Sequence, residues 1–175
     1  MVKMPQEDGK EVLMAVLQRR GRFNTEKMKL ESYPGCCQVT VHGKLNEGEE
    51  IMTGLRRETE EELGLFFAET YFSLCGHYVG TIIHKTSDES VITFGTVMPI
   101  DLLRGIRLGP DSGGLVYVNE KRINDQRIIF EIGKDDKDMV PDAMKKYGPS
   151  EAATIAMFPD EVEAVRKAFE VFGQK

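Results

Sequence analysis

The sequence has no tryptophan, only three histidines and three cysteines, and no long apolar run. An odd number of cysteines, two of them adjacent at Cys36 and Cys37, does not make a disulfide framework, so we expect a reducing cytoplasm. The histidines and cysteines also lack the spacing of zinc ligands. No apolar stretch approaches the roughly 18 residues that a membrane span needs. The first eleven residues have no apolar core, so we expect no signal peptide.

The chain also lacks an excess of positive charge. It has 23 lysines and arginines against 29 aspartates and glutamates, for a net charge of −6. This balance argues against stable nucleic-acid binding and against binding to anionic membranes. A length of 175 residues with 41% hydrophobic residues suits one domain with a good core, which we expect to span residues 1–175.

One stretch, Gly43 to Leu65, is rich in glutamate and bounded by glycines, and it reads GKLNEGEEIMTGLRRETEEELGL. From about Glu50 to Leu63 its residues are mostly strong helix formers. Gly64 stands where a left-handed C-terminal cap is expected. One face of this helix is expected to pack on a sheet, with the spacings i+3 and i+4. Its residues are Met52, Leu55, Thr59 and Leu63.

A different face of the same helix carries three carboxylates, from Glu58, Glu61 and Glu62. They repel one another, and Arg57 alone cannot neutralise them. Mg²⁺ prefers oxygen ligands and often binds a few carboxylates together with substrate phosphates, so the face indicates a metal site. An isolated run of glutamates is more often a solvated helix face, and this interpretation is the alternative.

The spacing of the charged residues and glycines favours the metal site. It resembles the Nudix box, whose pattern is G-x5-E-x7-R-E-U-x-E-E-x-G-U, with U aliphatic. At roughly one in 15 per position, seven matches would occur by chance about once in 10⁸ starting points. Thr59 departs from the pattern at the first aliphatic position, where its methyl group can still pack. The seven matching residues are Gly43, Glu49, Arg57, Glu58, Glu61, Glu62 and Gly64.

This resemblance implies an α+β fold, a Nudix-type α/β/α sandwich around a mixed β-sheet. It implies a hydrolase that cleaves a diphosphate linkage in a nucleoside diphosphate-X or nucleoside triphosphate, with Mg²⁺ or Mn²⁺ as cofactor. The partner is then a small nucleotide or diphosphate, and a homodimer is common in the family. The implied metal ligands are Glu58, Glu61, Glu62 and the carbonyl of Gly43.

The resemblance also implies roles for other residues around the box. Arg57 is expected to pair with Glu49 or with a box glutamate and so to fix the loop. Glu61, or an acid outside the box, is expected to orient or deprotonate the attacking water.

Several residues near the box are candidates for contacts with substrate: His42, Arg19 and Lys44. His42 replaces a glycine that family members often have, and it either contacts substrate or metal or fills the loop. Arg19 follows a predicted strand that ends near the ligand in Nudix folds, although a solvated turn is the simpler interpretation. The further acid has three candidates, which the sequence does not rank: Glu120, Glu131 and Asp138.

Two alternatives remain open. Tyr33-Pro34-Gly35 and the run that follows are similar to isopentenyl diphosphate isomerase, a Nudix relative, but Val41 or His42 stands where that enzyme has a cysteine. A non-catalytic, nucleotide-sensing Nudix module usually loses box glutamates, and all are present here. The family's ADP-ribose proline is missing near Gly80, and the tryptophan-containing NADH marker is absent. These absences favour a nucleoside triphosphate or another diphosphate as substrate.

The rest of the chain alternates short apolar runs with polar turns. A terminal helix from Pro159 carries an apolar stripe, Val162, Val165, Phe169 and Phe172, and should cover the sheet face opposite the box helix. Helices or turns are predicted at 99–103 and 141–147, and loops at 24–32 and 109–114. Strands are predicted at 11–18, 37–41, 65–74, 78–85, 91–98, 115–118 and 127–132.

Overall fold

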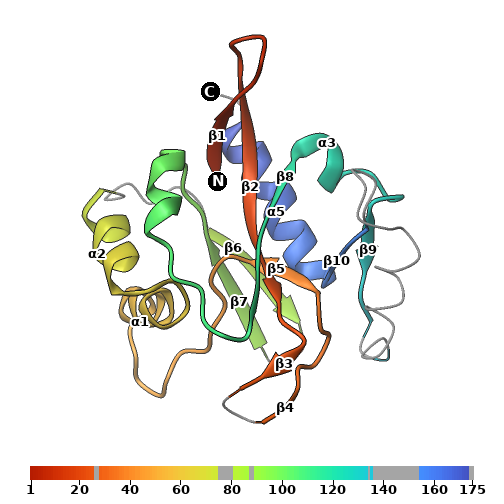
Figure 1. Ribbon diagram of the computed structural model, residues 1–175. Coiled ribbons are helices and arrows are strands. Elements are labelled where there is room, and N and C mark those ends of the chain that lie inside the picture. Colours follow the sequence, from red (N-terminus) through yellow and green to blue (C-terminus); the bar gives the residue numbers. More distant parts are fainter. Residues whose placement is uncertain (26–27, 75–80, 87–88, 134, 136–153, 174–175) are drawn as a thin grey trace.

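The computed structural model describes residues 1–25, 28–74, 81–86, 89–133, 135 and 154–173 (Figure 1). Its centre is strand β2 (Glu11–Arg20), longer by two residues than predicted. β2 pairs antiparallel with β1 (Val2–Pro5), β5 (Cys37–Val39) and β8 (Ser112–Asn119). These pairings use the edges of β2 and leave both faces of the sheet open to packing by helices.

The two faces of β2 bury different cores, because side chains alternate along a strand. Ala15 and Leu17 pack with helix α5 (Pro159–Phe172) on one face. Val16 packs with helices α1 (Ile51–Leu63) and α2 (Leu65–Leu74) on the other. The terminal helix therefore covers the face opposite the box helix, and this prediction is confirmed.

The remaining elements form smaller units around this sheet. In place of one mixed sheet, the described strands form a four-stranded antiparallel sheet and three two-stranded sheets. The only parallel strand pair among the described residues is β9 with β10. The hairpin of β6 and β7 forms a sheet of its own and leaves a space beside β2. Residues 24–32, predicted as loop, include part of the short β3–β4 hairpin. The bounds are β3 (Phe23–Asn24), β4 (Lys29–Leu30), β6 (Thr81–Thr86), β7 (Glu89–Phe94), η1 (Ile100–Gly105), α3 (Glu120–Ile123), β9 (Ile129–Glu131) and β10 (Ile155–Met157).

Helix α1 begins and ends close to the predicted positions. Gly64 has φ +91° and its N–H donates to the carbonyl of Glu60, so glycine is required at this end. Thr59 and Leu63 are buried as expected. Met52 is 49% exposed and does not belong to the buried face, which was a wrong prediction. Buried Gly54 instead lets Leu45 approach, since a Cβ there would lie 2.3 Å from the Leu45 side chain.

Residues 65–74 form helix α2, and the predicted strand is wrong. The many aromatic residues favour a strand locally. Phe67 and Tyr71, four residues apart, lie on one side of α2 against the sheet, in the same core cluster as Leu63 at the end of α1. Leu65 and Phe66 point away and are exposed. Tertiary packing therefore overrides the local preference.

Helix α5 matches its prediction. Pro159 occupies the first turn, and the four predicted apolar residues are all buried. The segment 141–147 lies outside the described residues. Across the part of the chain that the structure describes, no helix has the length and apolar character to cross a bilayer.

Candidate active site

The loop before α1 is fastened by one guanidinium, that of Arg57. Its Nε and Nη2 donate to the two carboxylate oxygens of Glu49, each at a distance of 3.0 Å. Nη2 also donates to the carbonyl of Lys44 at a distance of 2.9 Å. Nη1 donates to Glu58 over 2.7 Å. These bonds hold the pKa of Glu49 down at about 2 and raise the pKa of Arg57. The predicted pairing of Arg57 with Glu49 is present in the structure.

Gly43 lies directly against the carboxylate of Glu58. A Cβ at position 43 would stand 1.8 Å from the Glu58 carboxyl carbon, so any side chain there would displace the Glu58 carboxylate. The glycine therefore brings the backbone of the loop next to the carboxylate face of α1.

Glu62 is a half-buried acid of the box whose pKa is raised. Burial raises its pKa to about 7, and the charges of Glu58 and Asp111 raise it further, while the backbone N–H of His42 opposes them. With its amide turned to donate, Gln18 lies 2.9 Å from a carboxylate oxygen of Glu62. Glu62 is thus a half-buried acid near two other acids, an arrangement typical of functional sites.

His42 connects the box loop to the start of helix α5. Its Nδ1 lies 2.9 Å from Oε1 of Glu161, which is 3% exposed. The other oxygen of Glu161 accepts from the backbone N–H of Val39 over 2.6 Å. The hydrogen bond to Glu161 raises the pKa of His42.

A polar cleft of about 520 Å³ opens beside the carboxylate face of α1. Arg20 forms part of its wall and is paired with Glu31 over 2.9 Å. The cleft brings together six of the residues predicted from the sequence: Arg19, His42, Gly43, Lys44, Glu61 and Glu62.

The predicted candidates for an acid outside the box lie elsewhere. Glu131 is on β9, 3.7 Å from Arg166, and Glu120 begins α3. Both elements lie across the molecule from α1 (Figure 1), and neither residue lines the cleft. Asp138 lies outside the described residues.

Asp111 is an acid in the cleft that the sequence did not single out. It follows Gly109 and Pro110 in a loop held to β2 by the N–H of Gly21, which donates to the Asp111 carbonyl over 2.6 Å. The sequence feature that could have pointed to Asp111 is the turn-forming run Gly109 to Gly114. In the structure, Gly114 adopts φ +101° beside a register shift in the pairing of β2 with β8. Irregularities of this kind often occur next to active sites.

The two adjacent cysteines are core residues. Cys36 and Cys37 are 0% and 1% exposed, and burial raises the pKa of the Cys36 thiol to about 12. A thiol held in its protonated form is a poor nucleophile.

The acidic residues of the cleft suit a hard divalent cation by their chemistry. Among the described residues, no three histidine, cysteine or acidic side chains are already arranged around one metal position. Burial and the nearby charges of Glu58 and Asp111 nevertheless make the ionised form of Glu62 unfavourable. A divalent cation would reverse that effect, and all the donors are oxygens of the type that Mg²⁺ prefers.

Comparisons with known proteins bear on the fold. No model of a protein family matches the sequence, and no curated protein matches it. The crystal structure of a MutT/Nudix family protein from Listeria innocua is similar, with a TM-score of 0.54 and 18% sequence identity. The similarity covers 99% of this chain and 88% of that chain. The chain has a Nudix-like fold.

The Nudix-like fold confirms the α+β class predicted from the sequence. At 18% identity the similarity concerns the fold alone. The roles of the individual cleft residues stay predictions.

Proposed function

We propose that the protein is a metal-dependent hydrolase of a diphosphate linkage, in a nucleoside diphosphate-X or nucleoside triphosphate. One observation carries this proposal. In a Nudix-like fold, the half-buried carboxylate of Glu62 shares a polar cleft with Glu61, Asp111, Arg19 and Lys44. The cleft thus combines acids for a cation with cations for phosphate.

The proposed cation ligands are oxygens in the cleft or next to it. Asp111 takes the part of the acid outside the box, in place of Glu120 or Glu131, because it is the one of the three in the cleft. When bound, Mg²⁺ or Mn²⁺ would neutralise charge on the diphosphate and lower the pKa of a bound water. The ligands would be Glu58, Glu61, Glu62, Asp111 and the carbonyl of Gly43.

The protein's own side chains have separate tasks in this proposal. Arg57 keeps the loop in place through Glu49 and the Lys44 carbonyl. The side chains of Arg19 and Lys44 would hold phosphate oxygens. Glu61, 59% exposed at the cleft, would orient the attacking water.

The test is the release of phosphate products with Mg²⁺ or Mn²⁺, followed by phosphorus NMR. The panel contains nucleoside triphosphates, ADP-ribose, nucleotide sugars, dinucleoside polyphosphates and alkyl esters of ADP. We expect cation-dependent cleavage of one class and a loss of several orders of magnitude in Glu61→Gln and Glu62→Gln. Wild-type turnover in both variants would overturn the mechanism.

A further inference from the structure

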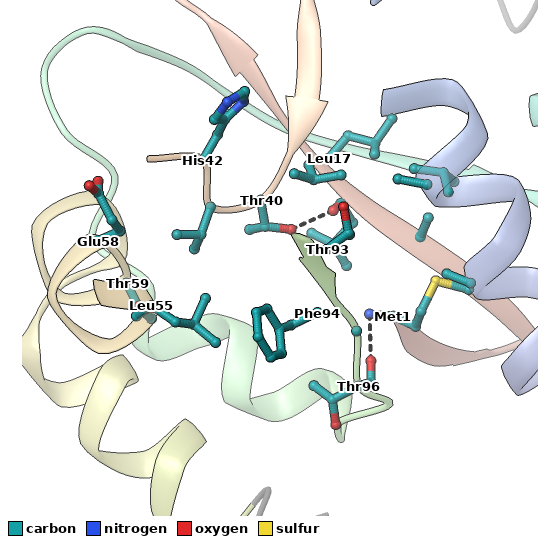
Figure 2. Close-up of a pocket in the computed structure, with 18 of the residues that line it drawn as sticks. Met1, Leu17, Thr40, His42, Leu55, Glu58, Thr59, Thr93, Phe94 and Thr96 are labelled. Carbon is teal, nitrogen blue, oxygen red and sulfur yellow. Dashed lines mark hydrogen bonds between the residues drawn. The ribbon is translucent and has the colours of Figure 1, made fainter. Parts of the chain in front are cut away.

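A second cavity, of about 550 Å³, lies between α1, β7 and α5, and no role has been assigned to it so far. Figure 2 shows His42 and Glu58 at one end and Met1 and Thr96 at the other. Its wall is mainly aliphatic and aromatic. Representative side chains are Leu17, Val39, Leu55, Phe94, Ala168 and Phe172.

Several polar groups in this wall are bonded to other protein groups. The Thr40 hydroxyl donates to the carbonyl of Val16 over 2.5 Å, and the Thr59 hydroxyl donates within its own helix. The ammonium group of Met1 donates to the carbonyl of Thr96 over 2.9 Å (Figure 2). A sugar or base placed among these groups would lose its bonds to water and gain few in return. A hydrocarbon chain loses nothing of that kind and gains burial.

The cavity adjoins the proposed site of hydrolysis. The segment His42-Gly43-Lys44 lines both the polar cleft and the apolar cavity, and Glu58 lines the cavity as well. A diphosphate bound at Gly43 would therefore have the apolar cavity directly beside it.

We infer that the group X joined to the nucleoside diphosphate is a hydrocarbon chain, and that this chain lies in the apolar cavity. The inference rests on the proposed function and narrows its substrate class. In the reaction, water adds to one phosphorus and the bond from that phosphorus to the bridging oxygen breaks. The bridging oxygen leaves with the other phosphate. The products are a nucleoside monophosphate and an alkyl phosphate, with the protons of water released to solvent.

The experiment uses a chain-length series of ADP esters, from methyl through hexyl to decyl, with ADP-ribose as the polar comparison. Burial of one methylene is worth roughly a fourfold change in affinity. We expect kcat/KM to rise by up to about fourfold per methylene until the chain fills the cavity. ADP-ribose should be a poorer substrate than the decyl ester.

Two phenylalanine substitutions test whether the hydrocarbon chain lies in the apolar cavity, and a third serves as a control. Thr96→Phe fills the far end of the cavity and should reduce kcat/KM for the decyl ester at least tenfold, with little change for the methyl ester. Ala168→Phe fills the α5 wall and serves as a second obstruction with the same expectation. Thr53→Phe adds the same ring on the exposed surface of α1, lines neither cavity, and should leave the series unchanged.

Calorimetric binding of the same esters to Glu62→Gln separates this inference from the proposed function. If methyl and decyl esters bind and react equally, or if Thr96→Phe blocks ADP-ribose as strongly as the decyl ester, the inference is overturned while hydrolysis stands. If binding grows with chain length but no ester is cleaved by the wild type, the proposed function fails, while the binding of a hydrocarbon chain in the apolar cavity stands.

Discussion

At the scale of single residues, the geometry of Arg57 matters more than its charge. Its planar fork holds both oxygens of Glu49 and also reaches the Lys44 carbonyl. Lysine keeps the charge but cannot make two parallel bonds. We expect Arg57→Lys to lower kcat by roughly ten- to a hundredfold, as loss of an outer-shell partner does.

The control for that substitution is its neighbour. Arg56 is exposed on α1, and Arg56→Lys should keep the wild-type rate. Steady-state kinetics with one diphosphate substrate measure both variants. Equal rates for Arg57→Lys and Arg56→Lys would show that the fork is not needed.

The second residue-scale prediction concerns Glu62 and pH. Its pKa is about 7 in the folded protein and near 4.5 in an unfolded chain. Below about pH 4.5 both states hold the proton and the free energy of unfolding carries no penalty. As pH rises from about 4.5 to 7, the unfolded chain ionises while the folded protein still holds the proton, so the metal-free protein loses about 3 kcal/mol of stability.

Urea unfolding in a chelator at pH 4.5 and 7.5 measures this loss. Glu62→Gln cannot ionise at this position and should lose about 3 kcal/mol less than wild type between the two pH values. Glu60→Gln, on the exposed side of the same helix, should follow the wild type, since all other titrating groups are shared. Parallel losses in wild type and Glu62→Gln would contradict the raised pKa.

At the scale of elements, Glu161 joins the first turn of α5 to β5 and to the box loop. Its buried carboxylate accepts from the Val39 N–H and from His42. Glu161→Ala leaves that N–H without its acceptor, at a cost of about 2 to 3 kcal/mol in the free energy of unfolding. Denaturant unfolding of the wild type and of Glu161→Ala measures this difference in the free energy of unfolding.

Two further variants define the role of Glu161. Glu161→Gln keeps an acceptor for Val39 and should recover much of the lost stability. Glu170→Ala removes a carboxylate from the exposed side of α5 and should change stability by less than about 0.5 kcal/mol. If Glu161→Ala were as mild as Glu170→Ala, the connection between α5 and the loop would not stabilise the fold.

The helices also show where local sequence suffices. Helix α1 was predictable because its helix-forming residues, its terminal glycine and the spacing of its carboxylates all indicate the same helix. Helix α2 was not, since its aromatic residues favour a strand locally and only the packing of Phe67 and Tyr71 against the sheet decides.

At the scale of the whole molecule, the sequence predicts one part of the site and does not predict the other. Glu58, Glu61 and Glu62 were predictable because they share one helix face. Asp111 and Gln18 reach the cleft from other parts of the chain, and only the pairing of β2 with β8 brings their elements together. The apolar cavity depends on the separation of the β6–β7 hairpin from the central sheet, which no local pattern indicates.

The most direct measurement is the turnover of one diphosphate substrate with Mg²⁺ by wild type, Glu62→Gln and Glu60→Gln. The two substitutions are chemically identical and lie two residues apart on one helix. Loss of several orders of magnitude in Glu62→Gln, with Glu60→Gln at the wild-type rate, is the predicted result. Equal turnover in the two variants would contradict a hydrolytic centre at the carboxylate face of α1.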